Sequence, residues 1–475
     1  MAVLFPKKLV VVGVLLALLV AVSLVVGAGV AIADDGNSLP AVYLIVDGYL
    51  YEDLEPYLEL WIEDLQGEGY DVLVYVAENS SASEIRELLH STPNLVGAVI
   101  VGWISAPWFE DEEVWGSDVY HACYPCDLYF MDLDGEWTDI DGNGLLDHHV
   151  GDVAPEIWVG RLTPPIDSPE RAVELLKAYF IRNHLYRTGG YTLPDRALIY
   201  LDDDFRWTAD YLTQVMEEIN QSYILVDDAA ETNAQDFLDR LAEGWSIVHV
   251  EAHGAPQVQL FKAGDSSWSG GCINPESLRR STPKAALFLL GSCSSGLYTK
   301  PNYIAGWYAF TDYGLAVVAS AKDWAGFFAS ESFYTSLDRC LGEALKSWLE
   351  YLCEHWNRML YHGVVFIGDP TLRLTDGGVD ADGDCLSDQL EERLGLNPRL
   401  PDTDGDGVSD YVQVLHGGLE TLKNGEAQRS EKIQLSWGGL VYVSIERLLE
   451  FIALIAVQPL FSSLIFGRLS RRGKP

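Results

Sequence analysis

Two reactive residues stand at the ends of two short apolar segments. Residues 245–254 read Trp-Ser-Ile-Val-His-Val-Glu-Ala-His-Gly, and residues 284–293 read Lys-Ala-Ala-Leu-Phe-Leu-Leu-Gly-Ser-Cys. Each segment has the continuous apolar pattern of a strand that is buried on both faces of a parallel sheet. Because ligands bind outside the carboxyl ends of such strands, we expect His253 and Cys293 to face one crevice.

A thiol beside an imidazole can act as a nucleophile. The imidazole raises the ionised fraction of the thiol and later protonates the leaving group. Taken singly, a cysteine at a strand end is most often a small buried hydrophobe, and a nearby histidine is often a core residue. The combination of His-Gly at one strand end and Cys at the next favours the catalytic interpretation. His249 lies in mid-strand, and we predict that it is a core residue.

These residues give the chain a resemblance to the gingipain family of cysteine peptidases, within the caspase and gingipain clan. Three further motifs support it: Tyr-Pro-Cys-Asp-Leu-Tyr-Phe-Met-Asp-Leu-Asp-Gly at 124–135, Pro-Glu-Ile-Trp-Val-Gly-Arg-Leu at 155–162, and Gly-Asp-Pro-Thr-Leu-Arg-Leu at 368–374. The resemblance covers most of residues 41–374. The caspase form Gln-Ala-Cys-x-Gly is absent, because this chain reads Gly-Ser-Cys-Ser-Ser-Gly, so specificity for Asp is not implied.

The resemblance implies an α/β fold in which a caspase-like parallel sheet with flanking helices forms two side-by-side subdomains, the second of which carries the chemistry. It also implies that a loop after residue 320 helps to wall the substrate pocket, a role that falls on Trp324 and, less directly, on Asp323. An acidic wall would favour Arg or Lys in the substrate, although Asp323 could equally be a solvated residue.

The chemistry expected of the dyad is peptide-bond hydrolysis through a thioester acyl-enzyme. Cys293 would attack the peptide carbonyl, and His253 would protonate the leaving amine. Backbone N–H groups of Gly254 and Cys293 would bind the oxyanion, which requires close approach and therefore suits glycine at 254. No third member of a triad is evident in the sequence. Glu251 would point to the same side as His253 in an extended strand, but no role can be assigned to it.

Hydrophobic periodicity predicts the elements that position the dyad. Strands are expected at 41–46, 71–76 and 95–101, with helices at 54–65 and 82–89 between them. The same alternation restarts with strands at 197–201 and 223–226 and helices at 211–219 and 234–241. Alternation of this kind specifies a parallel sheet with crossover helices. Two sheets in tandem and one extended sheet both fit the pattern.

Three acidic loops resemble the calcium-binding loop of EF-hands, in which oxygen ligands alternate around a sharp turn. The expected ligands are Asp139, Asp141, Asn143 and Asp147 in the first loop, Asp380, Asp382, Asp384, Asp388 and Glu391 in the second, and Asp402, Asp404, Asp406 and Asp410 in the third. The twelfth position is Val150 in the first loop and Gln413 in the third, and Cys385 replaces the usual glycine of the second. The last two loops resemble thrombospondin type 3 repeats. We therefore predict bound Ca²⁺, the alternative for the first loop being a plain acidic turn.

Composition and the chain ends bear on location. The chain has 475 residues with 71 acidic and 31 basic side chains, a balance that makes nucleic acid an unsuitable partner. Residues 1–33 read as a signal peptide or an N-terminal anchor, and 446–475 as a membrane segment with a basic tail. The basic residues at both ends predict that the rest lies outside the cell. Seven cysteines, an odd number, suggest that one thiol is left over in an exported chain, and Cys293 is the natural candidate.

The sequence thus predicts an N-terminal α/β subdomain at 34–190, a catalytic subdomain at 191–376, calcium repeats at 377–416 and a linker at 417–445. The predicted protein is a cell-surface cysteine endopeptidase that is anchored in the membrane by its C-terminal segment and acts on proteins or peptides. The alternative is a catalytically inactive, calcium-stabilised surface protein that binds partners on a peptidase-like fold. A transpeptidase is a third reading, since an amine can resolve an acyl-enzyme in place of water.

Overall fold

A computed structural model describes residues 38–115, 118–264, 267–323, 330–356, 358–375 and 378–432. The predicted signal segment at 1–33, the predicted membrane segment at 446–475 and Trp324 lie outside these residues. Among the helices of the described part, none is both long enough and apolar enough to cross a membrane. The account below concerns the compact unit that extends to Gly425.

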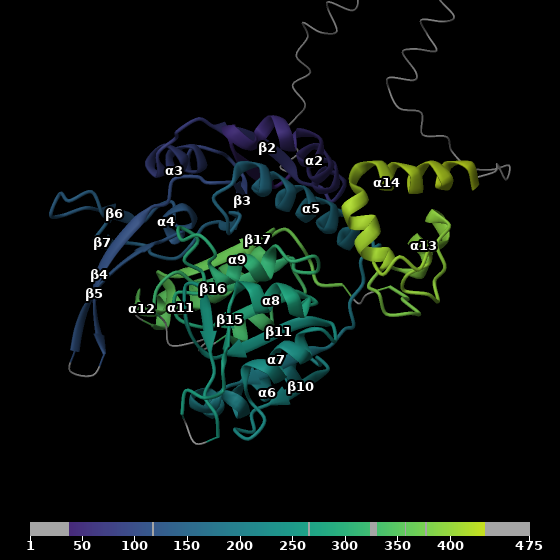
Figure 1. The fold of residues 1–475 in the computed structure, drawn as a ribbon. Coiled ribbons are helices and arrows are strands. Elements are labelled where there is room, and N and C mark those ends of the chain that lie inside the picture. The colour runs from purple at the N-terminus through teal and green to yellow at the C-terminus, as the bar shows by residue number, and fades with distance from the viewer. Residues whose placement is uncertain are drawn as a thin grey trace, which may run out of the picture. The chain divides into compact units, whose positions relative to one another are not determined.

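One ten-stranded sheet runs through this unit (Figure 1). Its order is β10-β9-β11-β15-β16-β17-β8-β3-β1-β2. The strands are β1 Ala41–Asp47, β2 Asp71–Ala77, β3 Leu95–Val101, β8 Trp158–Leu162, β9 Ala197–Leu201, β10 Tyr223–Val226, β11 Trp245–Glu251, β15 Ala285–Gly291, β16 Ala316–Ser320 and β17 Val364–Gly368. Of the two arrangements that the sequence allowed, the structure therefore has the single extended sheet.

Strand β17 joins the two halves of the sheet. It pairs antiparallel with β16 of the second half and parallel with β8 of the first half, through Ile367 and Arg161. The other neighbouring pairs of this sheet are parallel. The prediction of a largely parallel α/β sheet is confirmed, and the two expected halves share one sheet through β17.

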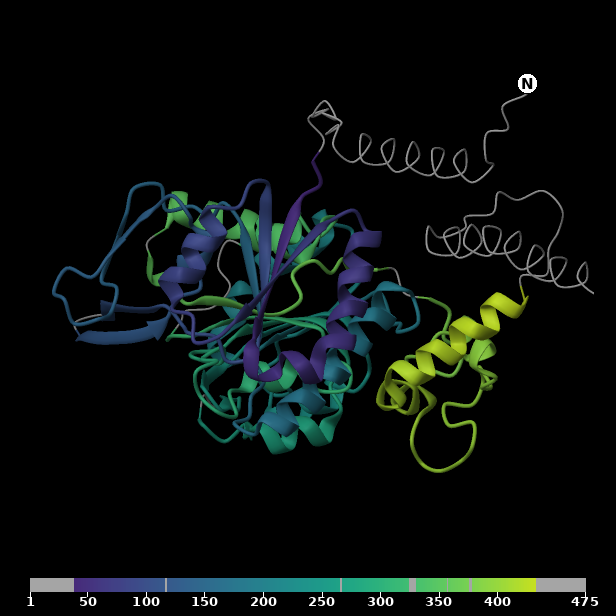
Figure 2. The same ribbon diagram turned by 90° about the horizontal axis from the view of Figure 1, so that it is seen from above.

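Helices cover both faces of the sheet, as Figure 2 shows from above. One hydrophobic core lies under α2 Gly48–Gly67, α5 Pro169–Arg187, α7 Ala234–Leu241, α8 Pro275–Ser281 and α9 Ile304–Ala309. The other lies under α3 Ala82–His90, α4 Leu128–Met131, α6 Ala209–Glu218, α10 Glu331–Tyr334, α11 Leu341–His355 and α12 Arg358–Tyr361. The inner strands of the sheet read as apolar runs because both of their faces are covered, whereas the edge strands β2 and β10 are partly exposed.

Several small elements surround the sheet. They are a hairpin of β4 Trp108–Trp115 and β5 Asp118–Pro125, a pair of β6 Glu136–Thr138 and β7 His148–Val150, a three-stranded sheet of β12 His253–Ala255, β13 Val258–Leu260 and β14 Cys272–Ile273, and the 3-10 helix η1 Asp203–Thr208. The C-terminal segment adds α13 Asp388–Leu394 and α14 Asp410–Lys432. Residues 417–432, predicted as linker, are thus helical, with a kink at Gly418 where φ is 64°. Leu419 and Leu422 pack against the core of the body, which accounts for the added helix.

Candidate active site

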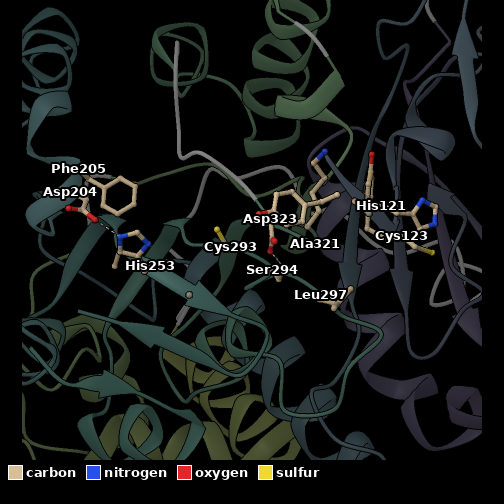
Figure 3. Close-up of a pocket in the computed structure, with 16 residues that line it drawn as sticks. His121, Cys123, Asp204, Phe205, His253, Cys293, Ser294, Leu297, Ala321 and Asp323 are labelled. Carbon is tan, nitrogen blue, oxygen red and sulfur yellow. Dashed lines mark hydrogen bonds and ion pairs between the residues drawn. The ribbon is translucent and has the colours of Figure 1, made fainter. Parts of the chain in front are cut away.

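His253 and Cys293 lie at the carboxyl ends of neighbouring strands. β11 and β15 pair in parallel, with Glu251 opposite Gly291, and each reactive residue follows two positions after its strand ends. Both residues line one cavity of about 810 Å³, together with Gly254 and Asp323 (Figure 3). The structure therefore brings together all the predicted dyad and pocket residues that it describes.

A tight turn fixes the backbone around Cys293. Ser294 has a positive φ of 53°, which is uncommon for a residue with a side chain. Its N–H donates to the carbonyl of Lys322 at 2.7 Å, and its Oγ donates to Oδ1 of Asp323 at 3.0 Å. These bonds tie the turn after β15 to the segment that follows β16. Cys293 therefore lies at the edge of the cavity, on a loop that these hydrogen bonds hold in place.

Asp204 supplies a partner for His253 that sequence reasoning missed. Its Oδ2 lies 2.7 Å from Nε2 of His253 and 2.5 Å from Nζ of Lys262. The hydrogen bond from the Lys262 ammonium group keeps the pKa of Asp204 below its ordinary value; burial opposes this shift, and the contact with His253 adds to it. Asp204 follows β9, the strand on the other side of β11. Its position in Asp202-Asp203-Asp204 after a predicted strand was the available signal.

Two aromatic rings orient the His253 ring. Phe205 lies with its centroid 5.2 Å from that of the imidazole, and Trp268 makes an edge contact at 4.9 Å. The side chain of His253 remains 31% exposed, so it can reach a ligand in the cavity. Packing on two sides and a hydrogen bond to Asp204 on a third leave the ring little rotational freedom.

Gly254 lies where a larger residue would not fit. A Cβ at this position would lie 2.9 Å from Cβ of Ser292 and 3.3 Å from the carbonyl oxygen of Cys293. The backbone of β12 therefore approaches the turn that holds Cys293 as closely as a glycine allows. This close approach agrees with the reason for which glycine was expected at 254.

Glu251 belongs to a different pair. Its Oε1 lies 3.0 Å from Nε2 of His249, and Nδ1 of His249 contacts the hydroxyl of Tyr334. The side chains of His249 and Glu251 are 1% and 2% exposed, which confirms that His249 is a core residue. A Cβ on Gly291 would collide with the Glu251 carboxylate, so β15 has a glycine at the point where this pair passes. Glu251 is thus buried in the core and pairs with His249.

The hairpin strand β5 forms the opposite wall of the cavity. Residues 120–124 line it, and Figure 3 shows His121 and Cys123 on the far side of the cavity from His253. Burial, and secondarily Glu110, raises the pKa of the Cys123 thiol. Apart from Cys293, the six cysteines, all in the described part of the chain, are thiols with no disulfide among them.

The three acidic loops have the same internal hydrogen bonds. In each, the first aspartate (Asp139, Asp380 or Asp402) accepts from the N–H groups of the fourth and sixth residues. The ninth (Asp147, Asp388 or Asp410) accepts from the second. The sixth residue has φ of 95°, 83° and 94° in turn, the middle value belonging to Cys385. The sequence pattern thus produces one loop conformation three times.

The loops differ in what surrounds them. Carboxylate oxygens of Asp380, Asp382 and Asp384 lie within 4.8 Å of one another, as do those of Asp402, Asp404 and Asp406. In the first loop Asp141 and Asp147 make such a group with Glu110 of β4, whereas Val150 occupies the twelfth position. Asn143 also donates to Glu110, at 2.7 Å. The sequence pattern did not point to Glu110 because it lies some thirty residues before the loop.

The described chain thus has a largely parallel α/β sheet with a thiol and an imidazole just beyond the carboxyl ends of adjacent strands. The sequence model of peptidase family C25 matches residues 69–375, about two thirds of the chain. The chain therefore belongs to peptidase family C25, a family of cysteine peptidases. No curated protein matches the chain.

Solved structures agree with this assignment at the level of the fold. The chain is similar to the crystal structure of the Arg-specific cysteine proteinase gingipain R (RgpB), with 15% identity and a TM-score of 0.51 over 72% of this chain and 80% of that one. It is also similar to the complex of the Porphyromonas gingivalis RgpB pro- and mature domains, with 16% identity and a TM-score of 0.51 over 71% of this chain and 80% of that one.

Proposed function

We propose that this protein is a cysteine endopeptidase in which Cys293 is the nucleophile and His253 the general acid and base. The observation that carries the proposal is the shared cavity: the side chains of both residues border it, and Asp204 contacts the imidazole at 2.7 Å. Membership of peptidase family C25 supports the same chemistry.

The reaction has two stages. In the first, the Cys293 thiolate attacks the carbonyl carbon of the scissile peptide bond, and His253 gives a proton to the leaving amine as the C–N bond breaks. In the second, His253 takes a proton from a water molecule, which attacks the thioester. The carboxylic acid leaves, and the Cys293 thiolate is regenerated with its proton on His253.

Backbone groups next to the dyad would stabilise the negative oxygen of each tetrahedral intermediate. The N–H groups of Gly254 and Cys293 are the proposed donors, and the close approach of β12 to the Cys293 turn supports this role. Asp204 acts as a positioning residue. It holds the imidazole through Nε2 and favours its protonated form during the reaction.

Asp323 is proposed to select a basic side chain before the scissile bond. It lines the cavity beside Cys293, and its Oδ1 accepts from Ser294, which fixes the carboxylate at the wall. A carboxylate at this place favours Arg or Lys in the substrate by charge pairing. Trp324, the other predicted wall residue, follows it directly in the chain.

We also propose that the chain is exported and held at the cell surface by residues 446–475, and that its acidic loops bind Ca²⁺. The apolar segments at the two ends support the first statement. For the second, the ligands are Asp139, Asp141, Asn143 and Asp147, with Glu110 in place of a twelfth-position carboxylate, and the aspartates of the other two loops. Oxygen ligands in flexible loops suit Ca²⁺.

The test is digestion of a denatured protein mixture by the full chain in detergent with Ca²⁺, followed by mass spectrometry of the new termini. Cuts made by the wild type are expected to vanish in Cys293→Ala and to persist in Cys272→Ser, which removes an exposed thiol outside the cavity. Cuts are expected after Arg or Lys, and Asp323→Asn should reduce that preference. Absence of cuts would instead support a non-catalytic binding protein, and joined peptides in place of hydrolysed ones would indicate a transpeptidase.

A further inference from the structure

The second acidic loop, at 380–391, has a buried carboxylate at its twelfth position, where the other two loops have Val150 and Gln413. Glu391, at the twelfth position, is 0% exposed, and neither of its carboxylate oxygens has a hydrogen-bond partner among the described residues. Within the same part of the chain, Oδ2 of Asp382 is also buried without a partner. A buried carboxylate with no compensation is costly, because desolvation disfavours its charge.

Neighbouring carboxylates add to this cost. Asp384 is 3% exposed, and carboxylate oxygens of Asp380, Asp382 and Asp384 lie within 4.8 Å of one another. The loop thus combines a close group of three aspartates with the buried carboxylate of Glu391.

The middle of this loop pairs with residues 190–192, the segment that links the two halves of the sheet. Leu386 forms an antiparallel bridge with Tyr191. The N–H of Thr192 donates to the carbonyl of Cys385 at 3.0 Å, and the N–H of Ser387 donates to the carbonyl of Gly190 at 3.0 Å. Residues 190–192 lie between α5, which covers the first half of the sheet, and β9, which begins the second half.

Packing reinforces the attachment. Leu390 fits against Gly190 so closely that a Cβ on this glycine would lie 2.7 Å from Cδ2 of Leu390. Cys385 and Leu386 belong to the core cluster of the body. Tyr411, at the start of α14, donates its hydroxyl to the carbonyl of Asp312, and its N–H donates to Oδ2 of Asp384. The Asp384 carboxylate therefore belongs to the group of loop aspartates and also holds the start of α14.

We propose, resting on the Ca²⁺ binding proposed above, that the cation held by Asp380, Asp382, Asp384 and Glu391 clamps residues 385–387 onto residues 190–192, which link the two halves of the sheet. The cation would supply the positive charge that Glu391 and Asp382 lack, and carboxylate oxygens are the ligands that Ca²⁺ prefers. Fixing these side chains fixes residues 385–387, and through them residues 190–192. The site is structural and does not depend on the proposed peptidase chemistry.

Calcium binding and hydrogen exchange test the clamp in the full chain carrying Cys293→Ala, which excludes self-digestion. The comparison is between Glu391→Gln and Glu392→Gln, which removes the same charge from an exposed neighbour. Titration with Ca²⁺ is expected to show one site weakened by at least about 100-fold in Glu391→Gln, since removing one partner from a buried charge cluster is strongly unfavourable. Glu392→Gln should bind as its parent does.

Exchange of the backbone amides reports the clamping itself. Adding Ca²⁺ should protect the peptide that contains Thr192, and should also slow tryptic cleavage after Arg393, in the parent and in Glu392→Gln. Neither change is expected in Glu391→Gln. Equal calcium affinity in the two variants, or calcium binding without protection around Thr192, would overturn the proposal.

If Glu391→Gln does not fold, two further measurements on the parent test the clamp. The first compares the parent with Ca²⁺ and with a chelator, and protection around Thr192 must appear only with Ca²⁺. The second replaces Ca²⁺ by Mg²⁺. Mg²⁺ is smaller and requires strict octahedral geometry, so we expect it to protect the amides around Thr192 less than Ca²⁺ does. Because all these readouts are made on an inactive chain, their failure leaves the peptidase proposal intact, and absence of peptidase activity leaves the clamp intact.

Discussion

His249 and His253 lie four residues apart in the chain, and each contacts a carboxylate, but the two pairs have different surroundings. His249 and Glu251 lie inside β11, at 1% and 2% exposure, with Tyr334 as a third partner. His253 and Asp204 lie beyond the strand end, at 31% and 38% exposure, beside the cavity. The same pair of groups thus serves stability in the strand interior and is available for chemistry at the strand end.

The largest expected effect comes from breaking the pair at the strand end. His253→Ala should lower kcat by at least about 10³-fold, because the nucleophile loses its base and the leaving amine loses its acid. The measurement is cleavage of a peptide substrate identified by the digestion experiment. The melting temperature should change little, since the side chain is partly exposed. Activity within tenfold of the wild type would remove His253 from the mechanism.

A substitution of Asp204 tests whether this carboxylate acts through His253. Asp204→Asn should reduce kcat by roughly 10²- to 10⁴-fold with a much smaller change in KM, because the imidazolium loses its stabilising charge. Asp203→Asn is the matched control, because the Asp203 carboxylate accepts a hydrogen bond from Thr232. An equal loss in both variants would mean that Asp204 only supports the local fold.

Gly254→Ala tests the backbone beside the pair. The added Cβ would meet Ser292 at 2.9 Å and push β12 away from the Cys293 turn. If the N–H of Gly254 binds the oxyanion, kcat should fall by about 10²-fold. Alkylation of Cys293 by iodoacetamide, which forms no oxyanion, should be nearly unchanged. A parallel loss of alkylation rate would point to a displaced thiol instead.

The smallest effect on catalysis is expected from the buried pair. His249→Gln should reduce the free energy of unfolding by about 1–3 kcal/mol, because Glu251 and Tyr334 would be left poorly paired in the core. Thermal unfolding in a Cys293→Ala background measures this loss. In the active chain kcat should stay within about threefold. A loss of kcat comparable with that of His253→Ala would make the two pairs one functional unit.

The sheet strands were predictable because their pattern is strong and local. The predicted strands at 95–101, 197–201 and 223–226 and the helix at 234–241 coincide with β3, β9, β10 and α7. The pattern of residues 331–353 predicts one helix, whereas the structure has two, α10 and α11. Their separation comes from tertiary hydrogen bonds, since the N–H groups of Leu341 and Gly342 donate to the carbonyls of Leu372 and Pro370. A single-sequence pattern carries no information on such distant partners.

The parts of the site that could not be predicted are those that depend on distant pairing. Asp204 reaches His253 only because β9 lies next to β11, and three consecutive aspartates gave no reason to choose the third. The β4–β5 hairpin, which walls the cavity, carries Glu110 to Glu113 in one strand, and such acidic runs are poor strand signals. By contrast, the dyad was visible because each residue ends an apolar run.

The position of β17 in the sequence determines when the ten-stranded sheet can be completed. This strand joins β8 to β16, and its partner Arg161 precedes Ile367 by about two hundred residues. During synthesis the first half of the sheet, and later the nucleophile itself, emerge from the ribosome before the strand that joins the halves exists. Pairings over such long sequence separations form late, because a long loop must be closed first. The two halves can therefore join into one sheet only after residue 368 has emerged.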